Sequence, residues 1–369
     1  MKVLITGSKG FIGQNLVAEL MTHEKIEVIE YHRDTNDDLL SDYCKQADFV
    51  FHLAGINRPE KETEFVEGNV NLTNKLLTML NEHNNTCPIM ISSSTQAELD
   101  NPYGQSKYSG EQLVYNYSKE TGAKVLIYRF PNVFGKWSKP NYNSVIATFC
   151  HNIARDIPIQ INNSKAELNL VYIDDLISEL INALNGQENK VNTYCEVGIM
   201  HKKTLQEIAD LIYSFKDSRQ DKSIPNMNDP FTKKLYSTYL SFLPEDEFNY
   251  PLKMNVDERG SFTEILKTKD RGQVSVNISK PGITKGNHWH HTKNEKFLVV
   301  SGQGVIRFRE VNTDEVIEYY VSDEKLEVID IPVGYTHNIE NLGKTDMVTI
   351  MWVNEMFNPD EPDTYFLEV

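Results

Sequence analysis

The sequence predicts an α/β domain with a doubly wound parallel sheet, followed by an all-β barrel domain. Up to about residue 215, short apolar runs alternate with helical patterns, and this alternation is typical of a parallel sheet. From residue 262 onward the pattern consists of strands separated by Gly, Asn and Asp turns, which is typical of a sandwich or barrel. The 369 residues are enough for two or three domains.

Five buried strands are predicted in the first domain, at residues 3–6, 27–31, 49–54, 89–92 and 125–130. Between the first two strands, five apolar residues are spaced for one helix face: Ile12, Leu16, Val17, Leu20 and Met21. Residues 217–258 are rich in Lys, Asp, Ser, Pro and Asn, which predicts a connector with a short helix around 231–242. We therefore expect domains at residues 1–245 and 246–369.

The first strand runs into a glycine-rich loop and then directly into a helix. Gly7 and Gly10 allow a tight turn and close approach of the backbone to a pyrophosphate, and Gly13 lets the helix pack on the strand. The helix N-terminus supplies unpaired N–H groups and the positive end of a dipole. The loop, with its next residues Phe11 and Ile12, therefore predicts a dinucleotide site, although an ordinary strand–helix turn is the alternative.

The end of the second strand indicates which cofactor binds. An NAD site has a carboxylate there for the ribose 2′-hydroxyl, whereas an NADP site has a cation for the 2′-phosphate. His32 and Arg33 stand where the acid would be expected, which favours NADP(H). In the alternative, Arg33 is merely solvated and Asp34 binds the ribose.

A tyrosine and a lysine four residues apart, Tyr103 and Lys107, share one helix face. The ammonium can then lower the phenol pKa from about 10 towards the working pH. The spacing alone is weak, because Tyr115 and Lys119 repeat it. The first pair is distinguished by the serine-rich segment 92–94, which lies at the carboxyl edge of a parallel sheet, where such folds bind ligands.

Together these motifs resemble the extended short-chain dehydrogenase/reductase family, whose members act mostly on nucleotide-activated sugars. The resemblance covers residues 1–215 and includes the segments 52–55, 129–135 and 171–175. It implies a Rossmann-type domain in which Tyr103 donates a proton and Lys107 lowers the Tyr103 pKa and holds the nicotinamide ribose. Ser94, or alternatively Thr95, orients the reacting oxygen. The resemblance also implies Leu53, Ala54, Gly55, Ser92 and Pro131 at the cofactor and Asn132 at the sugar nucleotide. Dehydratases of this family carry an Asp–Glu pair after the active-site hydroxyl, which is missing here, so elimination of water is not expected.

Two segments of the second domain offer metal ligands. His288 and His290 are two apart on an extended segment, so their side chains point to the same face, and Glu295 and His337 can converge on them. Three histidines and one carboxylate can bind Zn, Mn, Fe or Ni. The spacing resembles the two cupin motifs over residues 260–355 and implies a cupin barrel that holds a divalent metal, with zinc expected. His291 and Tyr335 are candidates for a base.

A reductase fused to a cupin resembles a family of bifunctional capsular-polysaccharide enzymes. The resemblance implies that the cupin domain epimerises a UDP-activated 4-keto-6-deoxy-hexosamine at C3. The reductase domain then reduces C4 with NADPH to UDP-2-acetamido-2,6-dideoxy-L-talose, the precursor of UDP-N-acetyl-L-fucosamine. The alternative is an NAD(P)-dependent nucleotide-sugar C4 epimerase with a cupin dimerisation or binding domain. A cupin dioxygenase and a non-catalytic NADP sensor are further alternatives.

Composition and charge restrict partners and location. The formal net charge of −16, from 37 basic and 53 acidic residues, argues against a nucleic-acid surface, which needs clustered cations. No apolar run reaches the about 20 residues of a membrane-spanning helix or the shorter core of a signal peptide. The four cysteines form no CxxC pair, so neither disulfides nor a thiolate zinc site is expected. We expect a cytoplasmic homodimer that pairs through edge strands.

Overall fold

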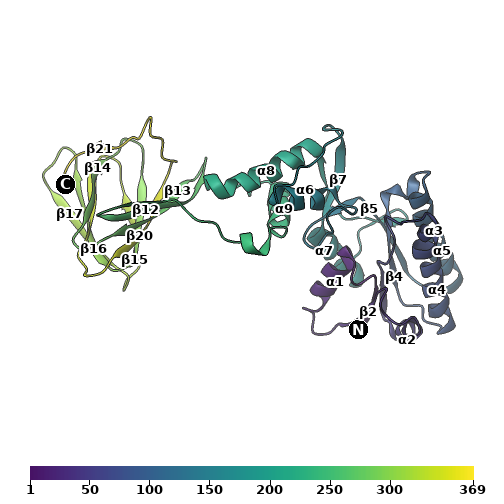
Figure 1. The fold of residues 1–369 in the computed structure, drawn as a ribbon. Coiled ribbons are helices and arrows are strands. Elements are labelled where there is room, and N and C mark those ends of the chain that lie inside the picture. Colours follow the sequence, from purple (N-terminus) through teal and green to yellow (C-terminus); the bar gives the residue numbers. More distant parts are fainter. The chain divides into compact units, whose positions relative to one another are not determined.

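The computed structural model describes all residues from Met1 to Val369 and divides into two compact units (Figure 1). The first unit comprises Met1–Phe215 and Asn228–Glu245, and the second comprises Lys216–Met227 and Asp246–Val369. None of the helices combines the length and the apolar character that crossing a bilayer requires.

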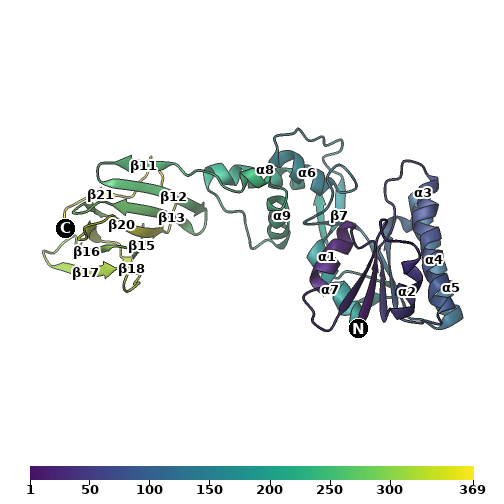
Figure 2. The same ribbon diagram turned by 60° about the horizontal axis from the view of Figure 1, so that its bottom comes forward.

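A seven-stranded sheet forms the centre of the first unit (Figure 2). In spatial order its strands are β2 (Glu27–Tyr31), β1 (Lys2–Thr6), β3 (Phe49–His52), β4 (Ile89–Ser94), β5 (Val125–Phe130), β9 (Tyr194–Cys195) and β8 (Lys190–Val191). All neighbours are parallel except β8 and β9. The chain changes direction of travel across the sheet between β1 and β3, and parallel sheets bind ligands at such a switch point.

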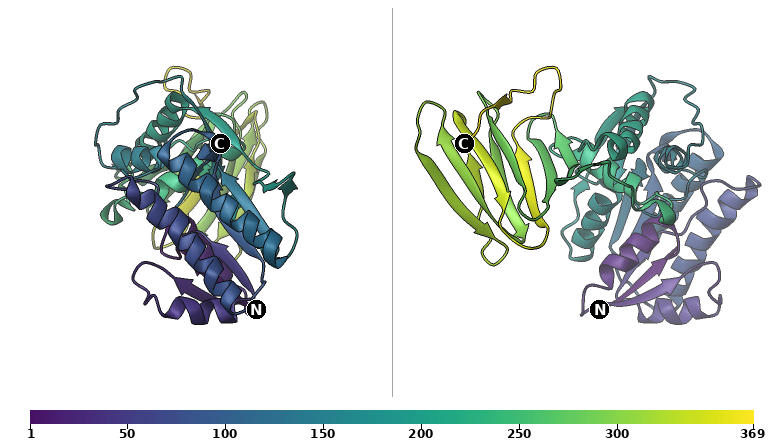
Figure 3. Two further views of the ribbon diagram at one scale, coloured as in Figure 1. Left: turned by 90° about the vertical axis from the view of Figure 1, so that its right-hand side faces the viewer. Right: turned by 60° about the vertical axis from the view of Figure 1, so that its left-hand side comes forward.

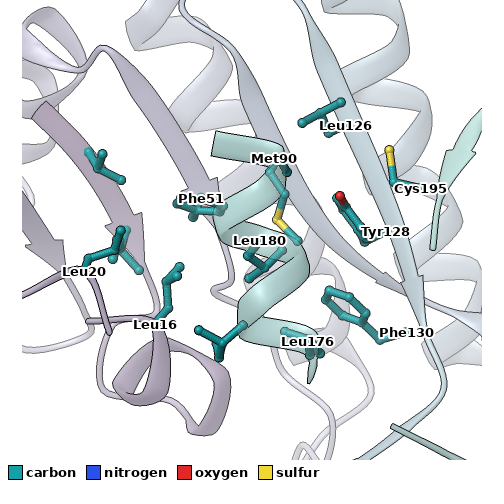
Figure 4. Close-up of a cluster of buried hydrophobic side chains, with 14 of the residues drawn as sticks. Leu16, Leu20, Phe51, Met90, Leu126, Tyr128, Phe130, Leu176, Leu180 and Cys195 are labelled. Atoms are coloured by element: carbon teal, nitrogen blue, oxygen red, sulfur yellow. The ribbon is translucent and has the colours of Figure 1, made fainter. Parts of the chain in front are cut away.

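Helices cover both faces of this sheet. One face carries α1 (Phe11–Leu20) and α7 (Ile173–Leu184), and the other carries α2 (Leu39–Gln46), α4 (Leu72–Glu82) and α5 (Pro102–Thr121). Because strand side chains alternate, Val3 and Ile5 pack against α1 and α7, whereas Leu4 packs on the opposite face. Figure 4 shows Leu16 of α1 and Leu180 of α7 among the strand side chains of the first core. The short helical turns α3 (Thr63–Phe65), η1 (Val66–Asn71) and η2 (Thr95–Glu98) complete this half of the unit.

A three-stranded sheet with its own core extends the first unit. Its strands are β10 (His201–Thr204), β7 (Glu167–Tyr172) and β6 (Asn132–Phe134), and its helices are α6 (Val145–Ala154), α8 (Leu205–Asp221) and α9 (Pro230–Leu240). Phe231 of α9 is buried in one cluster with Phe134 of β6. The helix expected in a connector is therefore part of a core.

Residues 216–227 group with the second unit, whereas the sequence analysis assigned them to the first domain. Their backbone pairs with β12 (Gly260–Thr268), because the Lys267 amide donates to the Lys222 carbonyl at 2.9 Å and the Ile224 amide donates to the Lys267 carbonyl at 3.2 Å. An ion pair between Lys222 and Glu264, 3.1 Å long, adds to this contact. Residues 216–227 therefore belong to the second unit, although the chain before and after them belongs to the first.

The second unit consists of two antiparallel sheets in two layers, as the right-hand view of Figure 3 shows. The six-stranded sheet contains β11 (Met254–Asp257), β12, β13 (Gly272–Ser279), β20 (Met347–Val353), β15 (Glu295–Ser301) and β18 (Ile329–Ile331). The five-stranded sheet contains β17 (Val316–Ser322), β16 (Gln303–Glu310), β19 (Tyr335–Asn341), β14 (Thr284–Trp289) and β21 (Tyr365–Phe366). A short turn, η3 (Glu245–Glu247), precedes them. Phe297 and Ile306 from the two sheets share the core. The predicted fold class, a parallel α/β domain followed by an all-β domain, is confirmed.

Candidate active sites

The glycine-rich loop leaves the end of β1 at the switch point of the sheet. Gly7 has a φ of +74°, and a Cβ there would lie 2.7 Å from the Ala54 amide nitrogen. A Cβ at Gly13 would lie 2.2 Å from the Gly7 carbonyl oxygen. Both positions therefore require glycine, one for the turn and the other for the close packing of α1.

The N-terminus of α1 is free to bind an anion. The helix begins at Phe11, its N-cap Gly10 offers no side-chain hydrogen bond, and its first turn has no acidic residue. The Ser8 hydroxyl is buried in the same loop and has no hydrogen-bond partner. Unpaired helix N–H groups and an unpaired hydroxyl at one point fit a phosphate group, as the loop motif predicts.

Beyond β2, where a ribose 2′-substituent is expected, the chain offers the cations Arg33 and Lys9. Arg33 is exposed and forms no ion pair, and the partly buried His32 accepts a hydrogen bond from the Asp34 amide at 3.2 Å. The Asp34 carboxylate lies 3.4 Å from the Lys9 ammonium. Sequence reasoning missed Lys9, although its position inside the glycine-rich loop was a signal. Because Lys9 pairs with Asp34, the acid is less available to a ribose hydroxyl.

The segment after β3 leaves space for Lys107. Leu53 and Ala54 are tied to β1, since their amides donate to the Thr6 carbonyl at 3.1 Å and to the Thr6 hydroxyl at 3.3 Å. A Cβ at Gly55 would lie 2.9 Å from the Lys107 ammonium. Glycine at this position therefore keeps open the space in which the ammonium sits.

Ser94, Tyr103 and Lys107 meet where β4 ends and α5 begins. The N-cap Asn101 accepts a hydrogen bond from the Gly104 amide at 2.8 Å, which starts α5 just before Tyr103. Lys107 is buried, and its ammonium donates to the Ser92 carbonyl at 3.1 Å. The Ser94 side chain acts on the Tyr103 phenol and lowers its pKa. The exposed Thr95 has no such effect on the tyrosine, so the geometry favours Ser94 of the two hydroxyls.

The predicted lowering of the Tyr103 pKa by Lys107 is not seen in the structure. Burial raises the pKa of Tyr103, and the Ser94 side chain opposes that rise only in part. The Lys107 ammonium is directed at the Ser92 carbonyl, and burial lowers the pKa of Lys107 to about 8. The helix spacing indicated correctly that the pair shares a face, but it could not give the direction in which the ammonium points.

Two buried polar residues that the sequence analysis did not single out surround this pair. Asn69 of η1 donates to the Ser106 hydroxyl at 2.9 Å and accepts from the Ile56 amide at 2.9 Å. Glu111 accepts hydrogen bonds from Ser93 and from Arg129, with Arg129 Nε and Nη2 at 2.9 and 2.7 Å. Glu111 follows Lys107 by four residues, so the same helix periodicity was a signal for it.

A cavity of 250 Å³ is lined by Thr95, which follows β4, and by Arg129 and Pro131 at the end of β5, among others. Asn132 follows Pro131 and is exposed, and its amide lies 3.5 Å from the Asn169 carbonyl oxygen, which is also at this cavity. The structure thus brings Pro131 and Asn132 near the carboxyl end of β4.

In the second unit, the four predicted metal ligands converge. His288 lies on β14, His290 just after it, Glu295 begins β15 and His337 lies on β19. One ligand atom from each of the four lies within 4.8 Å of the others. The Glu295 carboxylate is 3.1 Å from His337 Nε2 and 3.6 Å from His290 Nε2.

The chemistry of this cluster fits a divalent cation. His290 Nδ1 lies 2.6 Å from the Asp363 carbonyl oxygen, so this nitrogen donates and Nε2 keeps its lone pair for the cluster. His290 Nε2 is buried without a hydrogen-bond partner, as is His337 Nδ1. Burial lowers the pKa of His288 to about 4. Burial alone would raise the pKa of Glu295, but its contacts with His290 and His337 hold it well below the usual range. A neutral His288 beside an ionised Glu295 is the combination of protonation states in which such groups bind metals.

A cavity of 560 Å³ opens beside the cluster. His288, Glu295 and His337 line it, together with Asn255, Val256, Asp257, Arg259, Ser261, Phe262, Asn277, Lys285, Gly286, Phe297, Ile339 and Met351. The two residues that the sequence suggested as bases do not line it. The exposed His291 packs its ring against Trp289 and Tyr365, at 4.5 and 4.9 Å between ring centres. Tyr335 likewise lies outside the cavity lining.

Comparisons with known proteins agree with this two-part architecture. Residues 3–198 match the NAD dependent epimerase/dehydratase family, and residues 255–365 match the polysaccharide biosynthesis C-terminal domain. A Pseudomonas aeruginosa protein named UDP-2-acetamido-2,6-beta-L-arabino-hexul-4-ose reductase is 46% identical over 370 residues, which cover 100% of this chain and 99% of that protein.

Solved structures extend the similarity to the whole fold. The crystal structure of the capsular polysaccharide assembling protein CapF from Staphylococcus aureus is 61% identical and has a TM-score of 0.96, with 100% of both chains covered. A CapF structure with the inhibitor 3-isopropenyl-tropolone is 56% identical, with a TM-score of 0.91 and 100% of both chains covered. A UDP-glucuronic acid 4-epimerase from Bacillus cereus, 21% identical, shares the fold of the first unit with a TM-score of 0.56 over 66% of this chain and 98% of its own.

The predicted resemblance to capsular-polysaccharide enzymes is confirmed over the whole chain. A nicotinamide cofactor belongs to the matched family, and the loop of Gly7, Gly10 and Gly13 is the part of the chain that fits it. The chain therefore belongs to the NAD dependent epimerase/dehydratase family, as a member that continues into a polysaccharide biosynthesis C-terminal domain.

Proposed function

We propose that this protein is a bifunctional enzyme of capsular polysaccharide biosynthesis that acts on a UDP-activated 4-keto-6-deoxy-hexosamine. The barrel inverts C3, and the first unit reduces the C4 ketone with NADPH to UDP-2-acetamido-2,6-dideoxy-L-talose. The observation that carries the reductase proposal is that Ser94, Tyr103 and the buried Lys107 meet where β4 ends and α5 begins, at the carboxyl edge of the parallel sheet. The similarity to a reductase of a UDP-sugar ketone over the full chain supports the same substrate class.

In the reductase site, Tyr103 has the role of proton donor. Bound NADPH supplies a hydride to C4, and the C4 oxygen then needs a proton. The Tyr103 phenol stays protonated because burial raises its pKa, and Ser94 orients both the phenol and the substrate oxygen. Proton donation of this kind contributes typically about 10²–10⁴-fold to a rate. Lys107 binds the nicotinamide ribose from the space that Gly55 leaves open.

NADPH is the preferred nicotinamide cofactor in this proposal. A 2′-phosphate requires cations, and Arg33 is exposed without an ion pair at the end of β2. Lys9 is a second cation close by, paired with Asp34 at 3.4 Å. Phe11, Ile12, Leu53 and Pro131 are further candidates for contacts with the cofactor, and Asn132 for contact with the sugar nucleotide.

In the barrel, His288, His290, Glu295 and His337 hold a divalent cation, with zinc expected. Such a cation, when bound, supplies positive charge that favours an enolate over a ketone. The buried, unpartnered His290 Nε2 is the observation that supports a bound ion. A ketone at C4 acidifies the C3 hydrogen, so the barrel needs to stabilise the enolate and to exchange one proton.

One experiment tests both activities. The purified protein is incubated with the UDP-4-keto sugar in deuterated water, with and without NADPH, and the products are identified by NMR. We expect deuterium at C3 without NADPH, and the reduced talose product with it. Tyr103→Phe is expected to abolish NADPH oxidation and to leave deuterium entry intact, whereas Tyr115→Phe, on the exposed side of the same helix, leaves both intact. Loss of both activities in Tyr103→Phe would contradict separate sites.

The same assay separates the alternative function. A C4 epimerase interconverts two sugars through a nicotinamide that it retains, so it consumes no added NADPH. Net NADPH oxidation, equal in amount to the reduced sugar formed, therefore excludes it. No feature of the structure favours this alternative over the reductase.

A separate variant tests whether the metal takes part in epimerisation at C3. His290→Ala is expected to lose the metal and to stop deuterium entry at C3, while reduction of an already epimerised keto sugar continues. His291→Ala, the exposed neighbour, is the matched control and keeps both metal and exchange. If metal-free protein stays folded and exchanges the C3 hydrogen at the wild-type rate, the metal has no catalytic role.

The oligomeric state and the cytoplasmic location stay predictions. A homodimer is supported by the outer strand β17, which exposes Val316, Ile317, Tyr319 and Tyr320. Exposed apolar edge strands tend to pair with another chain. Sedimentation of the purified protein measures whether it is a dimer.

A further inference from the structure

Three titratable side chains line the barrel cavity besides the candidate metal ligands, and they differ in whether an ion pair already holds them. Arg259 and Asp257 are paired with one another, with Arg259 Nη2 and Nε at 2.6 and 3.0 Å from the Asp257 carboxylate. The third, Lys285, forms no ion pair. Its ammonium instead donates to the Asn277 side-chain oxygen at 2.8 Å and to the Ile278 carbonyl at 2.8 Å. Lys285 is thus the cation of the cavity that forms no ion pair with a carboxylate.

A β-bulge in β14 brings Lys285 to the same side of the strand as the metal ligands. Residues 285 and 288 are three apart, so a regular strand would place them on opposite faces. Gly286 pairs with Asn338 and His288 pairs with His337, and Asn287 is the extra residue between them. Gly286 and Asn287 have φ angles of +110° and +59°. The bulge shifts the alternation by one residue, and Lys285 and His288 therefore both line the cavity.

The hydrogen bonds of Lys285 leave one N–H for a ligand. An ammonium has three N–H donors, and two of them are held by Asn277 and Ile278. Because both acceptors are uncharged oxygens, they fix the position of Nζ without cancelling its charge. The third N–H is available to an oxygen atom in the cavity, beside the residues that hold the metal.

We propose that Lys285 is a catalytic residue of C3 epimerisation, whose ammonium donates a hydrogen bond to the C4 oxygen of the UDP-4-keto sugar. This inference rests on the proposed function of the barrel. When the C3–H bond breaks, the proton passes to water in the open cavity and its electron pair moves into the C3–C4 bond. The C4 oxygen then carries the negative charge of an enolate. Return of a proton from water to the opposite face of C3 restores the ketone with inverted configuration.

An ammonium next to the C4 oxygen lowers the barrier of this reaction because its hydrogen bond strengthens as the charge develops. Interactions that are stronger in the transition state than in the ground state accelerate a reaction. Removal of one such donor typically costs about 10²–10³-fold in rate. The charge is needed, but a transfer of the lysine proton is not, so arginine can replace lysine in this role.

The test compares Lys285→Met, Lys285→Arg and Lys285→Gln in the full-length, metal-loaded protein. Deuterium entry at C3 of the UDP-4-keto sugar is measured by NMR without NADPH, together with bound zinc and the rate of reduction of the epimerised sugar. Lys285→Met is expected to slow exchange by about 10²–10³-fold, with zinc content and reduction unchanged. Lys285→Arg is expected to restore most of the exchange. Lys325→Met, at a side chain that is 76% exposed, is the matched control and keeps the wild-type rate.

Several outcomes would overturn this role of Lys285. Exchange in Lys285→Met at the wild-type rate would show that the ammonium does not act on the reaction. Loss of zinc with loss of exchange would show a structural role. If Lys285→Met does not fold, Lys285→Gln, which can still donate to Asn277 and Ile278, gives the same comparison. Absence of exchange in the wild-type protein would refute the proposed function of the barrel itself, and is therefore distinguishable from failure of this inference.

Discussion

Replacement of Glu111 by alanine tests how the first unit holds the residues proposed for reduction. The Glu111 side chain is 1% exposed and that of Arg129 is 13% exposed, with 2.7 Å between their nearest charged atoms. Glu111 also accepts a hydrogen bond from Ser93, which lies between Ser92 and Ser94 on β4. The carboxylate thus joins α5, β4 and β5 next to the contacts of Tyr103 and Lys107.

The expected loss of stability in Glu111→Ala depends on how well the remaining Arg129 charge is compensated. Without Glu111, the only ion-pair partner of Arg129 is Glu98, whose side chain is 72% exposed. Removal of one partner of a buried pair costs about 3–5 kcal/mol, because it leaves an uncompensated charge. In a domain of this size, each kcal/mol lowers the Tm by about 2–4 °C. The expected fall in the Tm of the first unit is therefore about 6–20 °C.

Scanning calorimetry of the full chain measures this change, with the transition of the second unit as an internal reference. Glu98→Ala is the matched control, and it should cost less than about 1 kcal/mol because that pair is exposed. Glu111→Met combined with Arg129→Met removes both charges and should recover most of the lost stability. A loss below about 1 kcal/mol in Glu111→Ala would refute this account of the ion pair.

Three other predictions concern the cofactor, the pH profile and the metal. Arg33→Ala should lower kcat/KM for NADPH by about 10-fold to 100-fold and hardly change it for NADH, because a charge-assisted bond to the 2′-phosphate contributes about 1.5–3 kcal/mol. Lys25→Ala is the control. A wild-type preference for NADH would refute the assignment of NADPH as the cofactor. Because burial lowers the pKa of Lys107 to about 8, its ammonium loses its proton as pH rises through that value. The kcat/KM of reduction should fall above it, while Tyr103, with its raised pKa, remains a donor; a flat profile would contradict a role for the charged Lys107. The Asp363 carboxylate accepts hydrogen bonds from the His291, Thr292 and Lys293 amides, and the Asp363 backbone carbonyl accepts one from His290. Asp363→Ala should therefore weaken zinc binding by about 10-fold to 100-fold, measured by competition with a chelator. Unchanged zinc affinity would refute this supporting role of Asp363.

Features that depend on neighbours in sequence were predictable. The glycine-rich loop and the shared helix face of Tyr103 and Lys107 follow from spacing and periodicity alone. The four candidate metal ligands came from spacing that resembles known motifs, and the structure brings their ligand atoms within 4.8 Å. The geometry of the loop and of the helix pair is set within a short stretch of chain, whereas the metal cluster depends on His337 of β19, which only the resemblance to known motifs linked to the other three residues.

Features that depend on distant partners were not predictable. The direction of the Lys107 ammonium is set by the Ser92 carbonyl and by the space at Gly55. Glu111 is paired by Arg129 on another element. Lys285 reaches the cavity only because a bulge interrupts the alternation of β14, and periodicity assumes that alternation is regular. A one-residue shift of this kind moves a side chain from one face to the other.

The C4 ketone determines the order in which the two proposed reactions must occur. The C3 hydrogen is acidic only while C4 is a carbonyl, so inversion precedes reduction, and a sugar that has been reduced can no longer exchange at C3. The same oxygen is therefore treated in opposite ways by the two units. In the barrel, C4 must still be a ketone when the product leaves, so a hydrogen-bond donor that keeps its proton is sufficient. The Lys285 ammonium, held by Asn277 and Ile278, is such a donor. In the first unit the oxygen must keep a proton, and Tyr103 has to give one up. An ammonium in the barrel and a phenol in the reductase site are the kinds of donor that these two requirements select.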